Sequence, residues 1–264
     1  MIQTETNKYF FSKKLDAYFM GYNKAYRFII EFFKQAIKPP FHFREIINQC
    51  FEIGLKSLPL ITLTGFIIGI VFTKQSRPSL EEFGATSWLP SLIGIAIVRA
   101  LGPLVTGLIC AGKIGSGIGA ELGSMKVTEQ IDAMEVSAIN PFKYLVVTRV
   151  TATIITIPVL SFYCIFVGLM GSFMNVNSEE TTSIVTFFKN SFSTISFLDV
   201  FTSLTKSLVF GFTIGIIGCY KGFNATQGTR GVGKAANQAV VTAMFIIFIE
   251  EMIIVQVANW IRHF

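Results

Sequence analysis

Long apolar runs constrain this chain most, because each is long enough to cross a lipid bilayer as a helix. A spanning helix needs about 20 mostly apolar residues. Four stretches meet that requirement clearly: Ile53–Thr73, Trp88–Ala111, Leu145–Phe173 and Val240–Ile261. A fifth, Phe197–Cys219, also qualifies, although Asp199 and Lys206 interrupt it. We therefore expect five transmembrane helices, which place the two ends of the chain on opposite sides of the membrane.

The composition agrees with a membrane protein. Of the 264 residues, 52% are hydrophobic and only 14% are charged, whereas soluble domains carry about 25% charged residues. The four cysteines lie far apart in apolar runs, without the spacing of a disulfide framework or a metal site, and there are only two histidines. The expected fold class is an all-α integral membrane protein without a metal or other cofactor.

The orientation follows from the positive-inside rule, which places loops rich in Lys and Arg in the cytoplasm. With the N-terminus inside, fifteen Lys and Arg residues fall on the cytoplasmic side and four on the other. We therefore expect a cytoplasmic N-terminus. The net charge of +6 is read as a topology signal rather than as a nucleic-acid-binding surface.

The segment before the first span is expected to be an amphipathic helix over Leu15–Lys38, ended by Pro39-Pro40. Apolar and aromatic residues recur every three or four positions, with charged residues between them. Such a helix lies in the membrane interface, or alternatively packs on a soluble partner. The predicted division is an interfacial segment, residues 1–50, and a five-helix domain, residues 51–264. The first fifty residues are polar and basic and do not resemble a cleavable signal peptide.

Two stretches nearly match a phosphate-binding loop: "GLICAGKI" at Gly107–Ile114 and "GTRGVGKA" at Gly228–Ala235. Both lack the hydroxyl that must follow the lysine, and neither follows a strand. We therefore do not expect the chain to bind ATP. Small residues four apart instead allow helix backbones to approach closely, within one chain or between two copies. The candidate close-packing residues are Gly112, Gly115, Gly119 and Gly123.

A short acidic helix is expected between the second and third spans, in "GAELGSMKVTEQIDAMEVSAINPFKYL". Thr128 is a plausible N-cap, and Asn140-Pro141 ends the helix. About ten residues are too few to span a membrane. The helix is either a solvated connection or a docking element for a cytoplasmic partner.

The run "LGPLVTGLICAGKIGSGIGAELGSMKVTEQIDAMEVSAINPFKYLVVTRV", Leu101 to Val150, resembles the signature of the MlaE-type permeases. These are membrane subunits of ABC transporters that move lipids between bacterial membranes. "KSLVFG" at Lys206–Gly211 and "GVGKAANQAVV" at Gly231–Val241 extend the resemblance more weakly.

The resemblance implies a non-catalytic, homodimeric permease in the bacterial inner membrane, with a periplasmic C-terminus and a lipid cavity at its midline. A separate ATPase would dock on the acidic helix, and a periplasmic MCE-domain protein on the outer face. Such a system moves phospholipids between the inner and outer membranes and so bears on outer-membrane lipid asymmetry. The expected coupling residues are Glu121, Met125, Thr128, Glu129, Gln130, Asp132 and Glu135.

The chain departs from the family pattern at two places. It has Arg99-Ala100 where the family commonly has Arg-Glu, and Glu250-Glu251 where the family commonly has a single Asp. Ionisable side chains in spans usually face a bundle interior or a wet cavity, so the substrate-cavity candidates are Arg99, Lys206, Glu250 and Glu251. Two interpretations stand: Lys206 forms an interhelical ion pair with Glu250 or Glu251, or Arg99 and Lys206 bind the phosphate of a lipid headgroup.

Three other functions remain as alternatives. A stand-alone secondary transporter of an amphipathic substrate normally shows internal repeats and broken helices, and no convincing repeat is found. A membrane-embedded lipid enzyme is disfavoured by the shortage of histidines and paired acids. A structural scaffold fits poorly with charges inside the spans.

Overall fold

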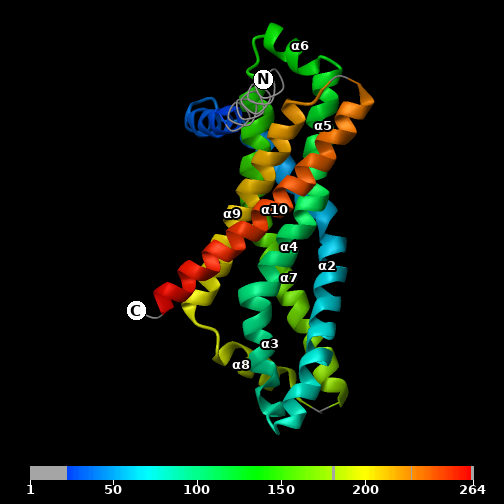
Figure 1. Ribbon diagram of the computed structural model, residues 1–264, viewed down its shortest axis with the longest axis vertical. Coiled ribbons are helices and arrows are strands. Elements are labelled where there is room, and N and C mark those ends of the chain that lie inside the picture. The colour runs from blue at the N-terminus through cyan, green and yellow to red at the C-terminus, as the bar shows by residue number, and fades with distance from the viewer. Residues whose placement is uncertain (1–22, 180–181, 227, 263–264) are drawn as a thin grey trace, which may run out of the picture.

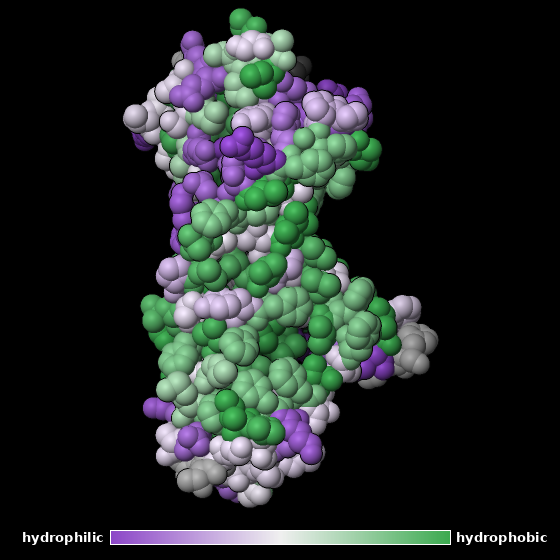
Figure 2. Space-filling view, turned by 180° about the vertical axis from the view of Figure 1, so that it is seen from behind, coloured by the Kyte–Doolittle hydropathy of each residue, from purple (hydrophilic) through white to green (hydrophobic). Residues whose placement is uncertain are grey.

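The computed structural model describes residues 23–179, 182–226 and 228–262, and within these ranges every regular element is helical. Five of the helices are long and apolar enough to cross a membrane, so the predicted all-α class and the five expected spans are confirmed. Figure 2 shows the corresponding surface, a broad apolar band between two more polar ends.

The spans are longer than the apolar runs that predict them. They are α2 (Phe43–Glu82), a composite second span (Thr86–Val127), a third span (Phe142–Ser178), α9 (Phe197–Phe223) and α10 (Thr229–Arg262). The second span is built from η1 (Thr86–Trp88), α3 (Leu89–Ala96), η2 (Ile97–Leu101), α4 (Gly102–Cys110), η3 (Ala111–Gly115) and α5 (Ser116–Val127). The third consists of η4 (Phe142–Val147) and α7 (Thr148–Glu179).

Two short helices lie between spans and are too short to cross the membrane themselves. They are α6 (Gln130–Val136), between the second and third spans, and α8 (Ile184–Ser193), between the third span and α9. Figure 1 shows α6 and α8 at opposite ends of the molecule, with the C-terminal half of α10 leaving the main body beside the start of α9.

Helix α7 packs along α2 through glycines that bring the two backbones together. A Cβ at Gly69 would overlap the Gly168 carbonyl oxygen, and one at Gly171 would lie 2.5 Å from the Phe66 carbonyl oxygen. The Ser172 hydroxyl also donates a hydrogen bond to the Gly69 carbonyl at 3.0 Å. In lipid, helices are held together by van der Waals packing, which close approach of the backbones allows, and by interhelical hydrogen bonds.

The small residues of the second span are used for packing within the chain. A Cβ at Gly119 would lie 3.2 Å from the Ala239 Cβ of α10, and one at Gly123 would lie 3.4 Å from the Ala225 Cβ. Gly112 and Gly115 face Met244 and Ile214 more loosely. These glycines therefore pack η3 and α5 against α9, α10 and the segment between them, and they give no separate support for a contact between two copies.

The expected interfacial helix is described only from residue 23, and its first part, residues 15–22, lies outside the described residues. The described part is helical over residues 23–37. Its aromatic face packs on the protein itself, with the Phe28 ring 4.9 Å from that of Phe142 and 5.4 Å from that of Tyr220. Tyr26 and Phe33 remain exposed, so one edge of the helix stays available to lipid.

We predict that Gly69→Ala destabilises the protein by about 1–3 kcal/mol, because the new methyl group forces α2 away from α7. The matched control is Gly233→Ala on α10, where an added Cβ meets no atom within 4 Å. That change should be neutral or stabilising by up to about 1 kcal/mol. Thermal unfolding of the purified chain in detergent measures both, and equal melting temperatures would contradict the prediction.

Candidate functional site

Lys206 is the centre of a buried polar cluster that joins three spans. Its side chain is fully buried on α9, and its ammonium group donates to a carboxylate oxygen of Glu251 on α10 at 2.5 Å. It also donates to the backbone carbonyl of Arg99, in η2, at 3.0 Å. Pro103 has no N–H for the carbonyl four residues before it, and that carbonyl belongs to Arg99. Lys206 therefore supplies this carbonyl with a donor that the proline cannot supply.

Asp199 links the same three spans one level further toward α8. It closes a capping box at the start of α9, where its Oδ2 accepts the Ser196 N–H at 3.0 Å. Its Oδ1 is 3.0 Å from Nη2 of Arg99 and 2.5 Å from Nη2 of Arg262 on α10. A buried carboxylate needs such partners because its charge is costly to desolvate.

Three of the four cavity candidates, Arg99, Lys206 and Glu251, therefore lie in one cluster, whereas Glu250 has a separate partner. Lys206 pairs with Glu251, Arg99 pairs with Asp199, and the Thr213 hydroxyl donates to Glu250 at 2.5 Å. The second carboxylate oxygens of both glutamates are buried and lack a partner among the described residues.

Asp199 was not among the predicted site residues. Its signal was nevertheless present in the sequence, because Ser196 followed three residues later by an acid just before an apolar run is typical of a helix N-terminus. The two charged residues that interrupt the fifth apolar run thus have structural roles. Asp199 caps α9, and Lys206 forms an ion pair with Glu251.

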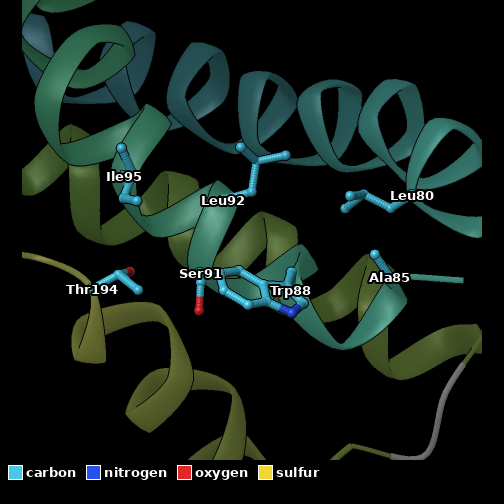
Figure 3. A pocket seen from close by; sticks show the side chains of 7 residues that line it. All are labelled: Leu80, Ala85, Trp88, Ser91, Leu92, Ile95 and Thr194. Atoms are coloured by element: carbon cyan, nitrogen blue, oxygen red, sulfur yellow. The ribbon is translucent and has the colours of Figure 1, made fainter. Parts of the chain in front are cut away.

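A hollow of about 400 Å³ lies between the end of α2, the α3 turn and the segment after α8 (Figure 3). Its lining is almost wholly apolar, since the only polar contributions come from Ser91, Thr194 and the Trp88 indole. Ser91 is itself occupied, because its hydroxyl donates to the Asn190 carbonyl at 3.0 Å. The lining residues are Leu80, Ala85, Trp88, Ser91, Leu92, Ile95 and Thr194.

This apolar hollow and the polar cluster are neighbours along one helix. Ile95 lines the hollow and Arg99 follows it by four residues, which places both on one helix face. The arrangement offers hydrocarbon-binding surface next to buried charges. Such a combination suits an amphipathic molecule better than a small polar one.

At the opposite end of the molecule, α6 differs from the helix expected there. The prediction that Thr128 is its N-cap is wrong: Thr128 ends α5, and its hydroxyl donates to the Ser124 carbonyl at 2.9 Å. Glu129 occupies the N-cap with a left-handed backbone, φ 60°. The helix has seven residues rather than about ten, because the reversal of direction after α5 uses residues 128 and 129.

The charged face of α6 is exposed, as expected. Ile131 is buried and anchors the helix to the core, while Asp132 and Glu135 face outward and Gln130 is exposed at its first turn. Lys126 pairs with Asp132 at 2.8 Å, which holds α6 against the end of α5. Met125 packs partly buried against the main core.

A buried arginine ties together the two chain segments that carry α6. Arg149 on α7 donates from Nη2 to Glu121 on α5 at 2.7 Å and from Nη1 to the Leu145 carbonyl at 3.2 Å. Glu121 was predicted as a coupling residue, whereas Arg149 was not, because no spacing in the sequence links the two. Among the described residues no group of three His, Cys, Asp or Glu side chains is placed to hold a metal ion.

Comparison with known proteins matches a family model described as "Permease MlaE" to residues 46–257. A probable ABC transporter permease protein of Rickettsia typhi is 37% identical over 220 residues, which cover 83% of this chain and 85% of the relative. A probable ABC transporter permease protein of Synechocystis sp. is 38% identical over 207 residues, 78% of each chain. The chloroplastic protein trigalactosyldiacylglycerol 1 of Arabidopsis thaliana is 32% identical over 220 residues, 83% of this chain and 63% of the relative.

We predict that Lys206→Met lowers the stability of the chain by about 3–5 kcal/mol, because Glu251 is left as an unpaired buried charge. Adding Glu251→Leu should restore more than half of the loss. The control is Lys56→Met, which breaks the exposed Lys56–Glu52 pair and should cost less than about 1 kcal/mol. Thermal unfolding of the unmodified chain and of these three variants measures the losses, and a Lys206→Met variant as stable as Lys56→Met would refute the prediction.

Proposed function

This chain belongs to the MlaE permease family, and from that premise we propose that it is the membrane subunit of an ABC transporter that moves phospholipids. The observation that carries the lipid assignment is the apolar hollow beside α3, with the buried cluster of Arg99, Asp199, Lys206 and Glu251 one helical turn away. Acyl chains fit an apolar lining, and a headgroup phosphate fits a position near Arg99, because Arg99 and Arg262 share the single carboxylate of Asp199 and leave a positive charge over. The name of the Arabidopsis relative contains that of a glycolipid, which supports the broader class of a membrane lipid.

The energy for transport comes from a separate ATPase subunit that docks on α6. An exposed acidic helix on an otherwise sparsely charged protein supports this docking role. The Lys126–Asp132 pair connects this helix to the end of the second span, and the Arg149–Glu121 pair joins the second span to the third; both contacts support a role in transmitting force. The coupling residues are then Glu121, Met125, Glu129, Gln130, Asp132 and Glu135, with Thr128 ending the preceding helix.

The complete transporter contains two copies of this chain and an outer MCE-domain protein, and it lies in the bacterial inner membrane with its N-terminus in the cytoplasm. The exposed apolar residues of α10 support a second copy: only one face of this helix is buried, at Gly231, Ala235, Ala239, Ala243 and Ile247. Side chains such as Phe245, Phe248 and Met252 are exposed on the others. Together with the hollow, this surface provides walls for a shared lipid cavity.

We predict that Glu129→Lys and Asp132→Lys each uncouple ATP hydrolysis from lipid transport, because the docking face loses its negative charge. Reconstituted complexes of each variant should still hydrolyse ATP, but they should transport at least tenfold less lipid per ATP than the unmodified complex. Glu82→Lys, at the far end of α2, is the matched control and should leave the yield unchanged. Wild-type coupling in both α6 variants would argue against docking on this helix.

We predict that Leu92→Asp abolishes lipid transport, because a carboxylate in the hollow is costly to desolvate against an acyl chain. Leu208→Asp on α9 is the control, since Leu92 is 40% exposed and Leu208 is 38% exposed but only Leu92 lines the hollow. Lipid movement between membranes in a strain that depends on this chain provides the readout, with the amount of membrane-inserted protein checked for each variant. Equal transport by the two variants would remove the hollow from the lipid path.

A further inference from the structure

A second hollow, of about 170 Å³, lies between α2 and α5 on the same side of the molecule as α6. It is chemically unlike the apolar hollow, because charged side chains surround an apolar floor. The floor includes Ile53, Ile114 and Ile118. The charged and polar lining residues are Gln49, Glu52, Lys56, Lys113 and Glu121.

The position of this hollow coincides with a boundary of the membrane. Lys56 lies just inside the beginning of the first apolar run, Ile53–Thr73, and Lys113 lies just after the end of the second, Trp88–Ala111. Both lysines therefore sit where the hydrocarbon core gives way to headgroups. An apolar floor under a charged rim at this depth matches a lipid, whose acyl chains and phosphate meet at the same level.

Three of the charges at the rim are already balanced within the protein. Lys56 pairs with Glu52 at 3.0 Å, and Glu121 pairs with Arg149 at 2.7 Å. Within residues 23–179, 182–226 and 228–262, the Lys113 ammonium group has no acidic or hydrogen-bonding partner. One positive charge thus remains for a ligand.

Two further observations describe the walls of the hollow: one polar group in them lacks a partner, and the α5 wall leaves room for an occupant. Ser57, which lines the hollow, is 1% exposed, and its hydroxyl has no hydrogen-bond partner in the described part of the chain. A Cβ added at Gly117, on the α5 wall, would meet no atom within 4 Å. A buried polar group without a partner is costly, so the wall of the hollow at Ser57 is not fully satisfied by the protein itself.

We propose that the α2–α5 hollow binds the phosphodiester group of a membrane phospholipid, with Lys113 as its cation and the isoleucine floor beneath the glycerol and first methylenes. This site is separate from the transport hollow and does not depend on the proposed transport function. With the N-terminus in the cytoplasm, the bound lipid belongs to the cytoplasmic leaflet. There it holds α2 and α5 at a fixed separation next to the coupling helix.

The test measures the phospholipid that the full chain retains after purification in mild detergent, by native mass spectrometry. Lys113→Gln should lose one phospholipid per chain, and Lys113→Arg should keep it. Lys74→Gln, an exposed lysine near the other end of α2, is the control for non-specific attraction of headgroups. Titration with a short-chain phospholipid should show roughly tenfold to hundredfold weaker binding to Lys113→Gln, the loss expected for one charged hydrogen bond.

A second pair of variants tests the hollow without altering charge. Gly117→Trp fills it and should displace the retained lipid, whereas Gly233→Trp, at an equally open position on α10, should not. Unchanged lipid retention in Lys113→Gln and Gly117→Trp would overturn the proposal, as would an equal loss in Lys74→Gln. Displacement of the lipid by inorganic phosphate alone would show an anion site rather than a lipid site. Because these measurements need no ATPase, loss of transport with retained binding would count only against the proposed function.

Discussion

The hydrogen bond from Lys206 to the Arg99 carbonyl is the interaction on which the arrangement of the spans depends. Pro103 removes the donor that a regular helix would supply to this carbonyl, and an unpaired backbone carbonyl inside a membrane costs several kcal/mol. Lys206 on α9 donates a hydrogen bond to this carbonyl. Because the lysine is charged and buried, it also needs an acidic partner, which is Glu251 on α10. Lys206 thereby links the second span, α9 and α10. The π-helical segment Ile97–Leu101 immediately before Gly102-Pro103 accommodates the same disruption.

The second span connects the two ends of the molecule mechanically. It carries Ile95 and Arg99 near the apolar hollow and Glu121 near α6, within one continuous helical rod over Thr86–Val127. Arg149 fastens the far end of this rod to α7, so the segments entering and leaving α6 are held together. This continuity gives the proposed ATPase a route to the proposed lipid cavity.

The glycines that imitate a phosphate-binding loop have a different physical use. A Cβ at Gly107 would lie 2.9 Å from the Phe210 ring, and Gly112 and Gly115 face α10 and α9. Between them Lys113 points away from this packing and contributes to the α2–α5 hollow. The segment Gly107–Ile114 thus provides both a close helix–helix contact and a charged residue in the lining of the α2–α5 hollow. A nucleotide would need free backbone N–H groups, and here the helix uses them.

The sequence by itself determined the five spans, the short helix between the second and third, and the family, because these depend on local hydrophobic length and on a long specific motif. It also placed the four ionisable candidates within the spans, but it left open whether Lys206 pairs with Glu250 or Glu251. It missed Asp199 and Arg149 as partners and misplaced the cap of α6 at Thr128. Neighbouring residues on a helix point about 100° apart, so the choice of partner depends on how each helix is rotated and crossed. Only the tertiary structure decided that rotation, because it results from glycine contacts and from the bonds of Lys206 to the Arg99 carbonyl and Glu251.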